Sequence, residues 1–237
     1  MTDARQHLAL VLDTDDLDAA RAHARRFASW FATVKVGYEL YGAAGPAALD
    51  ALHEDGFAVF LDLKLLDIPT TVERAARVLG RRGADLLNLH AVGGLDMLRA
   101  GVHGLAAGAR EGGCPPPIAL AVTVLTSEAD ASAAAARLDL ARAAGCDGVV
   151  CAAAEARAAR ELGLAPMVPG IRLAGSLRDD HARAATPREA VEAGAEWLLI
   201  GRTVSAAGDP ERAAADVMSE VEAALAATSG PGRGRDR

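Results

Sequence analysis

Lysine is scarce in this sequence. Only two of its 25 basic residues are lysines, Lys35 and Lys64, and all the others are arginines. Both lysines lie within or beside short apolar runs, where an unpaired charge is costly to bury. Lysine can give up a proton near neutrality in suitable surroundings, whereas arginine cannot. The two lysines therefore indicate either proton chemistry or two structural ion pairs, and their scarcity alone does not separate these alternatives.

Other scarcities exclude whole classes of protein. The three cysteines, Cys114, Cys146 and Cys151, form no CxxC pair and are odd in number, which favours free thiols in a reducing compartment over a disulfide framework. No apolar run is long enough to span a bilayer, and the run Leu8–Leu12 is too short for a signal peptide. The net charge of −7 argues against general binding to nucleic acid or to anionic membranes. We therefore expect a cytoplasmic protein.

Apolar runs alternate with helical stretches rich in alanine, arginine and leucine. Most of these runs are apolar on both faces, which is typical of parallel strands covered by helices. The predicted strands are Leu8–Asp13, Thr33–Gly37, Ala58–Lys64, Leu86–His90, Ile118–Thr123, Gly148–Cys151, Pro166–Val168 and Trp197–Gly201. Predicted helices include Asp16–Trp30, Pro46–Asp55, Thr70–Arg82, Leu95–Arg110 and Ala131–Ala144, with another opening at Thr186-Pro187.

Eight strand–helix units without a break in composition predict an α/β fold, a single-domain (β/α)8 TIM barrel over residues 1–227. An open doubly wound sheet is the main competitor, but no glycine-rich dinucleotide motif follows the first strand. The long polar stretch Val168–Ala185 is expected to be a functional loop. Residues 228–237 are expected to form a disordered tail.

Charged residues gather where the predicted strands end, and in such a barrel these ends form the active site. Asp62 and Lys64 are two residues apart, so a regular strand would point both side chains to the same side. Asp67 lies beyond that strand. The strand ends in chain order carry Asp13, Lys35, Asp62, Lys64, His90, Thr123, Gly170-Ile171-Arg172 and Gly201-Arg202.

The order lysine, aspartate, lysine, aspartate at positions 35, 62, 64 and 67 suggests a specific chemistry. Alternating charges can keep the lysines protonated while each carboxylate lies beside cations. Asp62 would repel a substrate carboxylate, and the ammonium of Lys64 would stabilise and then protonate a carbanion. The pattern favours decarboxylation without a metal or an organic electron sink. Taken singly, Asp13 is equally compatible with a strand-end cap, and Lys35 with a plain ion pair to Asp62.

The last two strand ends predict a site for phosphate. Gly170 and Arg172 follow the seventh strand, and Gly201 and Arg202 follow the eighth. Loops at these positions commonly bind phosphate in such barrels through backbone amides, and an arginine adds a planar fork of donors. In isolation, a glycine and an arginine after a strand are also compatible with a turn and a solvated charge.

Residues 62–72 carry a specific pattern, DxKxxDIPxT, which resembles the orotidine 5'-monophosphate decarboxylase family. The resemblance covers nearly the whole chain, because further family motifs occur in the family's order. These motifs are Val11-Leu12-Asp13, Val34-Lys35-Val36-Gly37, Asn88-Leu89-His90-Ala91, Val122-Thr123-Val124-Leu125-Thr126-Ser127, Pro169-Gly170-Ile171-Arg172 and Gly201-Arg202.

This resemblance implies a homodimeric barrel without cofactor or metal, a carboxy-lyase that converts orotidine monophosphate to uridine monophosphate in the last step of de novo pyrimidine nucleotide synthesis. It implies that Lys64 protonates the ring carbon, that Asp62 crowds the substrate carboxylate, and that Lys35 supports the charges and the ribose. It assigns the remaining contacts to Asp13 at a ribose hydroxyl, Asp67 and Thr71 in the neighbouring subunit's site, Thr126 at the pyrimidine, and Arg172, Gly201 and Arg202 at the phosphate and its loop.

The sequence departs from the family pattern at three positions. Leu173 and Thr203 stand where the family often has proline, which is expected to loosen the local turns without removing a ligand. His181 stands where the family usually has a glutamine that bridges base and phosphate. Histidine has a different reach and can titrate near neutrality, but we still expect His181 to be a substrate ligand.

Two alternatives remain on the sequence alone. A related branch of decarboxylases acts on sugar phosphates with a magnesium ion and shares the Asp-x-Lys-x-x-Asp core, but Ile68-Pro69 and the late Pro-Gly-Ile-Arg favour the nucleotide branch. His90 has no second metal ligand at a useful spacing. A phosphate-binding scaffold without catalysis is the other alternative, although a pure binder has no need of the repelling carboxylate of Asp62.

We predict that His181→Gln preserves or improves affinity for the nucleotide substrate, because it restores the side chain that the family usually has there. The measurement is the dissociation constant of a nucleotide monophosphate for the two proteins. A large loss of affinity in the variant would contradict the assignment of His181 as a ligand.

Overall fold

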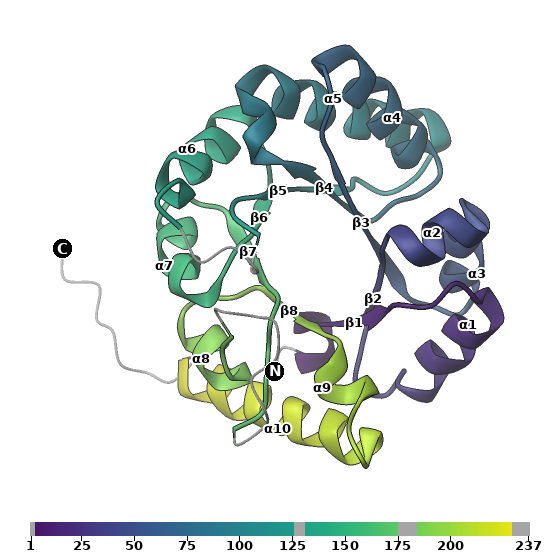
Figure 1. The fold of residues 1–237 in the computed structure, drawn as a ribbon, viewed down its shortest axis with the longest axis vertical. Helices are drawn as coiled ribbons and strands as arrows, with labels where there is room; N and C mark the ends of the chain where they lie inside the picture. Colours follow the sequence, from purple (N-terminus) through teal and green to yellow (C-terminus); the bar gives the residue numbers. More distant parts are fainter. Residues whose placement is uncertain (1–2, 126–130, 175–183, 229–237) are drawn as a thin grey trace.

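Eight parallel strands close into one barrel, each hydrogen-bonded to its neighbours in chain order (Figure 1). The predicted (β/α)8 TIM barrel is therefore confirmed. The computed structural model describes residues 3–125, 131–174 and 184–228, so the predicted C-terminal tail lies outside it except for Thr228. The strands are β1 (Leu8–Leu12), β2 (Thr33–Val36), β3 (Ala58–Leu65), β4 (Leu86–His90), β5 (Ile118–Val122), β6 (Gly148–Val150), β7 (Ala165–Val168) and β8 (Trp197–Ile200). Each strand end falls within one residue of its prediction.

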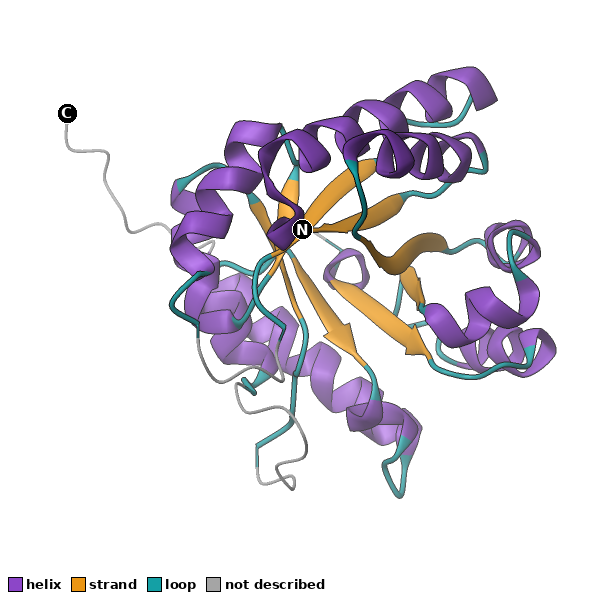
Figure 2. Cartoon of the chain, turned by 45° about the horizontal axis from the view of Figure 1, so that its top comes forward, coloured by secondary structure: helices purple, strands orange, loops and turns teal. Residues whose placement is uncertain are grey.

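Helices cover the outside of the barrel (Figure 2). They are α1 (Leu17–Arg26), α2 (Tyr38–Ala44), α3 (Ala47–Glu54), α4 (Pro69–Arg81), α5 (Gly94–Gly112), α6 (Ala134–Ala144), α7 (Ala153–Glu161), α8 (Pro187–Glu192), α9 (Arg202–Ser205) and α10 (Pro210–Thr228), with 3-10 turns η1 (Ala4–His7) and η2 (Ala91–Gly93). Among the described residues, no helix is both long enough and apolar enough to cross a membrane.

Most helix boundaries follow local signals in the sequence. Thr186 caps α8 in a reciprocal capping box with Glu189, and Pro187 takes the first helical position, as predicted. The helix predicted over Asp16–Trp30 is shorter than expected, because α1 ends at Arg26. There the chain turns so that Phe27 and Phe31 become fully buried, and burial of two aromatic rings outweighs continuation of the helix.

Glycine residues shape the outer layer in two ways. Five glycines that follow the ends of helices all have positive φ angles, which a residue without a Cβ adopts at little cost: Gly56, Gly83, Gly145, Gly163 and Gly194. On α5, Gly104 and Gly108 lie directly against the backbone of α4, and a Cβ at Gly108 would come within 1.9 Å of the Arg77 carbonyl oxygen. The close packing of α4 on α5 fixes the helix that follows β3.

The core has separate layers inside and outside the barrel wall. One cluster groups Phe60, Leu120, Val122, Val150 and Met167, which come from four different strands. A larger cluster joins the strands to the surrounding helices and includes residues from α1, α3 and α10. Cys146 lies in a third hydrophobic cluster. Burial raises the pKa of its thiol to about 12, so this cysteine stays protonated.

An ion-pair group joins α1 to the end of α3. Asp55 accepts hydrogen bonds from Arg21 Nε at 2.8 Å and from Arg25 Nη2 at 2.6 Å, and its side chain is only 6% exposed. The hydrogen bond from Arg21 is the main reason that the pKa of Asp55 falls from 3.8 to about 2. Because the folded pKa is depressed, this group stabilises the fold above about pH 4, and the contribution is lost as the pH falls towards 2.

We predict that Asp55→Asn lowers the free energy of unfolding by about 1 to 2 kcal/mol at pH 7, and that the difference from wild type shrinks between about pH 4 and pH 2. Urea unfolding over this pH range measures both effects. Asp216→Asn is a matched control, since Asp216 pairs with Arg212 on the exposed face of α10 and such pairs contribute little. An Asp55→Asn penalty that does not change with pH would contradict the explanation.

Candidate active site

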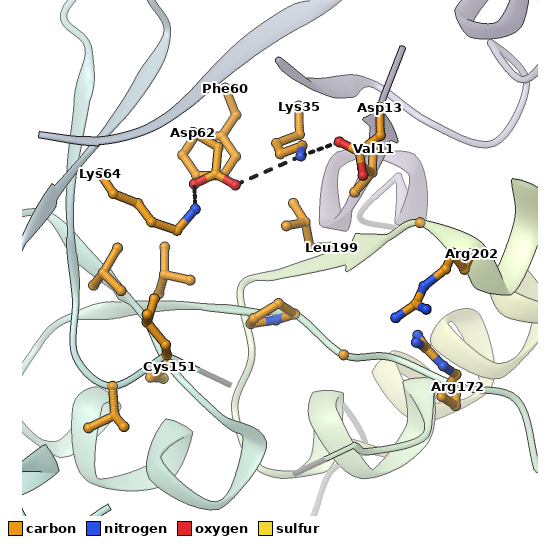
Figure 3. A pocket seen from close by; sticks show the side chains of 17 residues that line it. Val11, Asp13, Lys35, Phe60, Asp62, Lys64, Cys151, Arg172, Leu199 and Arg202 are labelled. Atoms are coloured by element: carbon orange, nitrogen blue, oxygen red, sulfur yellow. Dashed lines mark hydrogen bonds and ion pairs between the residues drawn. The ribbon is translucent and has the colours of Figure 1, made fainter. Parts of the chain in front are cut away.

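A cavity of about 270 Å³ opens at the carboxyl ends of the strands (Figure 3). Its lining comes from both halves of the chain, and none of the described residues of β4 takes part. The lining residues are Val11, Asp13, Lys35, Phe60, Asp62, Lys64, Val122, Val124, Leu125, Val150, Cys151, Pro169, Gly170, Arg172, Leu199, Gly201 and Arg202. The charged strand ends predicted from the sequence therefore meet in one cavity.

Four of these residues form a row of alternating charge. Lys35 Nζ lies 2.7 Å from Asp13 Oδ1 and 3.9 Å from Asp62 Oδ2, and Lys64 Nζ lies 2.5 Å from Asp62 Oδ1 (Figure 3). The Lys35 side chain is only 9% exposed and that of Asp62 14%, whereas that of Asp13 is 64% exposed. The row thus runs from a solvated carboxylate at β1 to a buried pair on β2 and β3. The contact between Lys35 and Asp62, which the sequence left open as a plain ion pair, is one part of this larger arrangement.

The backbone of β3 departs from a regular strand where it carries the row. Pairing with β4 runs Leu61 to Leu87 and resumes at Leu65 to Leu89, so β3 advances four residues while β4 advances two. Within this bulge, Lys64 has a φ of 42°, the only positive value at a described residue other than glycine. Asp62 and Lys64 both line the cavity, as predicted, but the regular alternation invoked for them does not extend to Lys64.

Gly37 leaves room for the ammonium of Lys35. A Cβ at this position would lie 3.0 Å from Lys35 Nζ and 3.8 Å from Asp13 Oδ1. The first distance is shorter than an ordinary van der Waals contact, so a larger residue would require the ammonium to shift by a few tenths of an ångström. The sequence motif around Lys35 contained this glycine but gave no sign of its function.

Two arginines lie on the other side of the cavity from Lys64 (Figure 3). Arg172 Nη1 donates to the Ile171 carbonyl oxygen at 2.8 Å and to Thr203 Oγ1 at 3.4 Å. Thr203 Oγ1 in turn donates to the same carbonyl oxygen at 2.5 Å. The turn at Thr203 was expected to be loosened by the lack of proline, but its hydroxyl makes a bond between the two arginine-bearing loops that proline could not make.

Several predicted site residues lie outside the cavity. Asp67 and Thr71 are exposed at the start of α4, where Asp67 Oδ1 accepts the backbone N–H of Ile68 at 2.6 Å. His90 Nδ1 accepts the N–H of Val92 at 3.4 Å. Thr123 is fully buried, and its hydroxyl donates to Glu155 Oε2 at 3.0 Å.

Two further predicted ligands, Thr126 and His181, fall outside the described residues. The loop expected over Val168–Ala185 is described only at its two ends, where Ile171 and Ala185 form a parallel bridge. Its assignment as a functional loop stays a prediction.

The apolar wall of the cavity was not predicted from the sequence. Val122, Val124, Leu125, Val150 and Cys151 come from β5, β6 and the residues that follow them. Figure 3 shows Cys151 facing the cavity on the side away from Asp62 and Lys35. Apolar residues at strand ends carry no chemical signal of their own, so only closure of the barrel distinguishes them from the rest of the core.

The residues of the cavity do not suit a metal ion. In the part of the chain that the structure describes, no group of three or more histidine, cysteine, aspartate or glutamate side chains is placed to hold one. The two carboxylates in the cavity, Asp13 and Asp62, already face lysine ammonium groups, which would compete with a cation.

A (β/α)8 barrel with charged strand ends and a pair of arginines beyond its last two strands is typical of enzymes that act on phosphate-bearing substrates. Residues 6–217 match the orotidine 5'-phosphate decarboxylase / HUMPS family. The chain belongs to this family, and the enzyme class predicted from the sequence, a carboxy-lyase, is confirmed.

Two relatives and one solved structure that are similar to this chain are named orotidine 5'-phosphate decarboxylase. An orotidine 5'-phosphate decarboxylase of Moorella thermoacetica is 42% identical over 92% of this chain and 93% of its own length. One from Lactiplantibacillus plantarum is 41% identical over 91% of this chain and 98% of its own. The crystal structure of orotidine 5'-phosphate decarboxylase from Lactobacillus acidophilus superposes with a TM-score of 0.73 at 30% identity, covering 91% of this chain and 99% of that one.

Proposed function

We propose that this protein decarboxylates orotidine 5'-monophosphate to uridine 5'-monophosphate without a metal or cofactor, with Lys64 as the proton donor. Family membership supports the reaction, and the contact of 2.5 Å between Lys64 Nζ and Asp62 Oδ1 inside the cavity supports the residue assignment. The contact brings an ammonium group and a carboxylate together at one point of the site.

The cavity has the polarity that a nucleotide monophosphate requires. Arg172 and Arg202, with the backbone at Gly201, offer cationic and amide donors to a phosphate at one end. The alternating row lies at the other end, and the apolar wall between them suits the face of a pyrimidine ring. A phosphate bound at the arginines would direct the base towards Asp62 and Lys64.

Asp62 destabilises the bound substrate in this proposal. The carboxylate of orotate, placed next to that of Asp62, brings two negative charges together where little water can screen them. Two like charges roughly 4 Å apart repel by about 4 kcal/mol at an effective dielectric constant of about 20. Loss of neutral carbon dioxide moves the negative charge from the carboxylate to the ring carbon beside Lys64, so repulsion by Asp62 is weaker in the transition state than in the ground state.

Lys64 stabilises the product of carbon–carbon bond cleavage. When carbon dioxide leaves, the electron pair of the broken bond stays on the ring carbon as a carbanion. The ammonium of Lys64 stabilises this charge and then donates a proton to the carbon, which leaves a neutral amine that solvent reprotonates. Lys35 and Asp13 hold the rest of the row and are placed to bind ribose hydroxyls.

We also propose that the active protein is a homodimer with shared sites. Tyr38, Leu66, Ile68 and Val92 are large apolar residues with 53% to 67% of their surface exposed, and they come from the mouth of the barrel at β2, β3 and β4. Asp67, between Leu66 and Ile68, is equally exposed. Covering this patch with a second copy would bury the apolar side chains and carry Asp67 and Thr71 towards the partner's cavity.

The remaining parts of the proposal concern ligands and location. Thr126 and His181 are proposed to contact the pyrimidine and to bridge base and phosphate, as the family resemblance implies. A cytoplasmic location is favoured by three cysteines, none of which forms a disulfide.

We predict that Lys64→Ala lowers turnover of orotidine monophosphate roughly 100- to 10,000-fold, because it removes the general acid. The change in ultraviolet absorbance of the substrate measures turnover, and wild type is assayed with and without a chelator. Equal turnover by both proteins would eliminate the proton-donor role. No turnover by either would favour a binding scaffold, and loss of wild-type turnover in chelator would favour the magnesium-dependent branch.

Mixing inactive variants tests the shared site. In a hybrid dimer of Lys64→Ala and Asp67→Asn chains, one site combines the intact Lys64 of one chain with the intact Asp67 of the other. We predict that random exchange of subunits restores about one quarter of wild-type activity. Mixing Lys64→Ala with Asp62→Asn is the matched control and should restore none, since these two residues act from the same chain. No recovery in the first mixture would place Asp67 outside the partner's site.

A further inference from the structure

One buried amide side chain contacts both members of the Asp62–Lys64 pair. Asn88, the only asparagine in the sequence, lies in the middle of β4 and has no exposed surface. Its Nδ2 donates to Asp62 Oδ1 at 2.7 Å, and its Oδ1 accepts the backbone N–H of Lys64 at 2.6 Å. Only one orientation of the amide satisfies both partners, because the carboxylate needs a donor and the N–H needs an acceptor.

The hydrogen bond to the Lys64 N–H compensates for the bulge in β3. Between Leu61 and Leu65 the ladder with β4 is interrupted, so this N–H has no regular backbone partner on β4. A buried N–H without an acceptor is unfavourable, as is a positive φ angle at a residue with a side chain. Asn88 supplies the acceptor, and Tyr38 Oη donates to the Leu63 carbonyl oxygen at 2.7 Å from the other side. The bulge is thus held by β4 on one side and by the first residue of α2 on the other.

The hydrogen bond to Asp62 fixes the carboxylate. Asp62 Oδ1 accepts from both Lys64 Nζ and Asn88 Nδ2, while Oδ2 faces Lys35. Without the amide, the carboxylate would be free to rotate about its terminal torsion and to present both oxygens to the lysines. Such rotation would move the negative charge away from the point at which the substrate carboxylate is proposed to bind.

We propose that Asn88 is a positioning residue, which holds the Asp62 carboxylate and the Lys64 backbone in the geometry that the reaction needs. The proposal rests on the proposed decarboxylation. Asn88 does not line the cavity, so it acts through Asp62 and Lys64 rather than by touching substrate.

The test compares wild type with Asn88→Ala, Asn88→Asp and the control Thr33→Val. Thr33 is a buried polar residue at the opposite end of the barrel, where β2 begins, and its variant should keep wild-type turnover. We expect Asn88→Ala to lower kcat about 100-fold while the dissociation constant of uridine monophosphate changes by less than about threefold. A kcat within about threefold of wild type, or an equal loss in kcat and in affinity, would overturn the proposal.

Asn88→Asp tests the positioning role of Asn88 if Asn88→Ala does not fold. It keeps the shape and the acceptor for the Lys64 N–H, but it places a second carboxyl against Asp62. The two carboxyls would share a proton at low pH, which restores a donor, and lose it as the pH rises. The ratio of Asn88→Asp turnover to wild-type turnover should therefore fall with rising pH. A ratio that stays constant from about pH 5 to about pH 9, where loss of the shared proton is expected, would reject the positioning role.

Failure of the proposed function has a separate outcome. If wild type does not turn over orotidine monophosphate, the proposed reaction is rejected, and crystal structures of wild type and of the Asn88 variants decide the positioning role by themselves. A positive φ at Lys64 and an unchanged contact between Lys64 Nζ and Asp62 Oδ1 in the variants would overturn it. Loss of either feature would support it.

Discussion

The contact between Asp62 and Lys64 depends on charge compensation along the whole row. Lys35 is almost fully buried, and a buried ammonium is tolerated only beside opposite charge. Asp13 and Asp62 provide that charge from the two strands that flank β2, because parallel pairing places Lys35 next to Val11 on one side and Phe60 on the other. Removal of any one member would leave a neighbour with an uncompensated charge. The row is therefore a single electrostatic unit, held in place by the closure of the barrel.

The short segment from β3 to α4 connects the cavity to an outer surface. Asp62 and Lys64 point into the cavity, whereas Leu66, Asp67 and Ile68 are exposed a few residues later. Directly after them, α4 packs closely on the glycines of α5, which leaves this helix little freedom to shift. A partner that covers the exposed residues would thus contact a segment that the packing of α4 on α5 holds in place. The proposed reaction and the proposed dimer therefore both depend on the segment from β3 to α4.

The two ends of the cavity contribute in different ways. The arginines and the Thr203 bond tie together the loops after β7 and β8, and they offer positive charge where a phosphate would bind. At the other end, negative and positive charges are held apart at fixed points before substrate arrives. In the proposed reaction, binding energy from the phosphate would place the base against an unfavourable charge, which is how remote contacts contribute to rate rather than to affinity.

The sequence by itself determined the barrel, the boundaries of its strands to within one residue, and the charged residues of the cavity. It could do so because strand and helix periodicity, glycine caps and the DxKxxDIPxT motif are all local along the chain. Only the tertiary structure decided the bulge at Lys64, the two hydrogen bonds of Asn88, the space at Gly37 and the link from Thr203 to Ile171. Each of these depends on which side chain of one segment meets the backbone of another. That pairing is set when the strands close into a barrel, so no periodicity within either segment contains it.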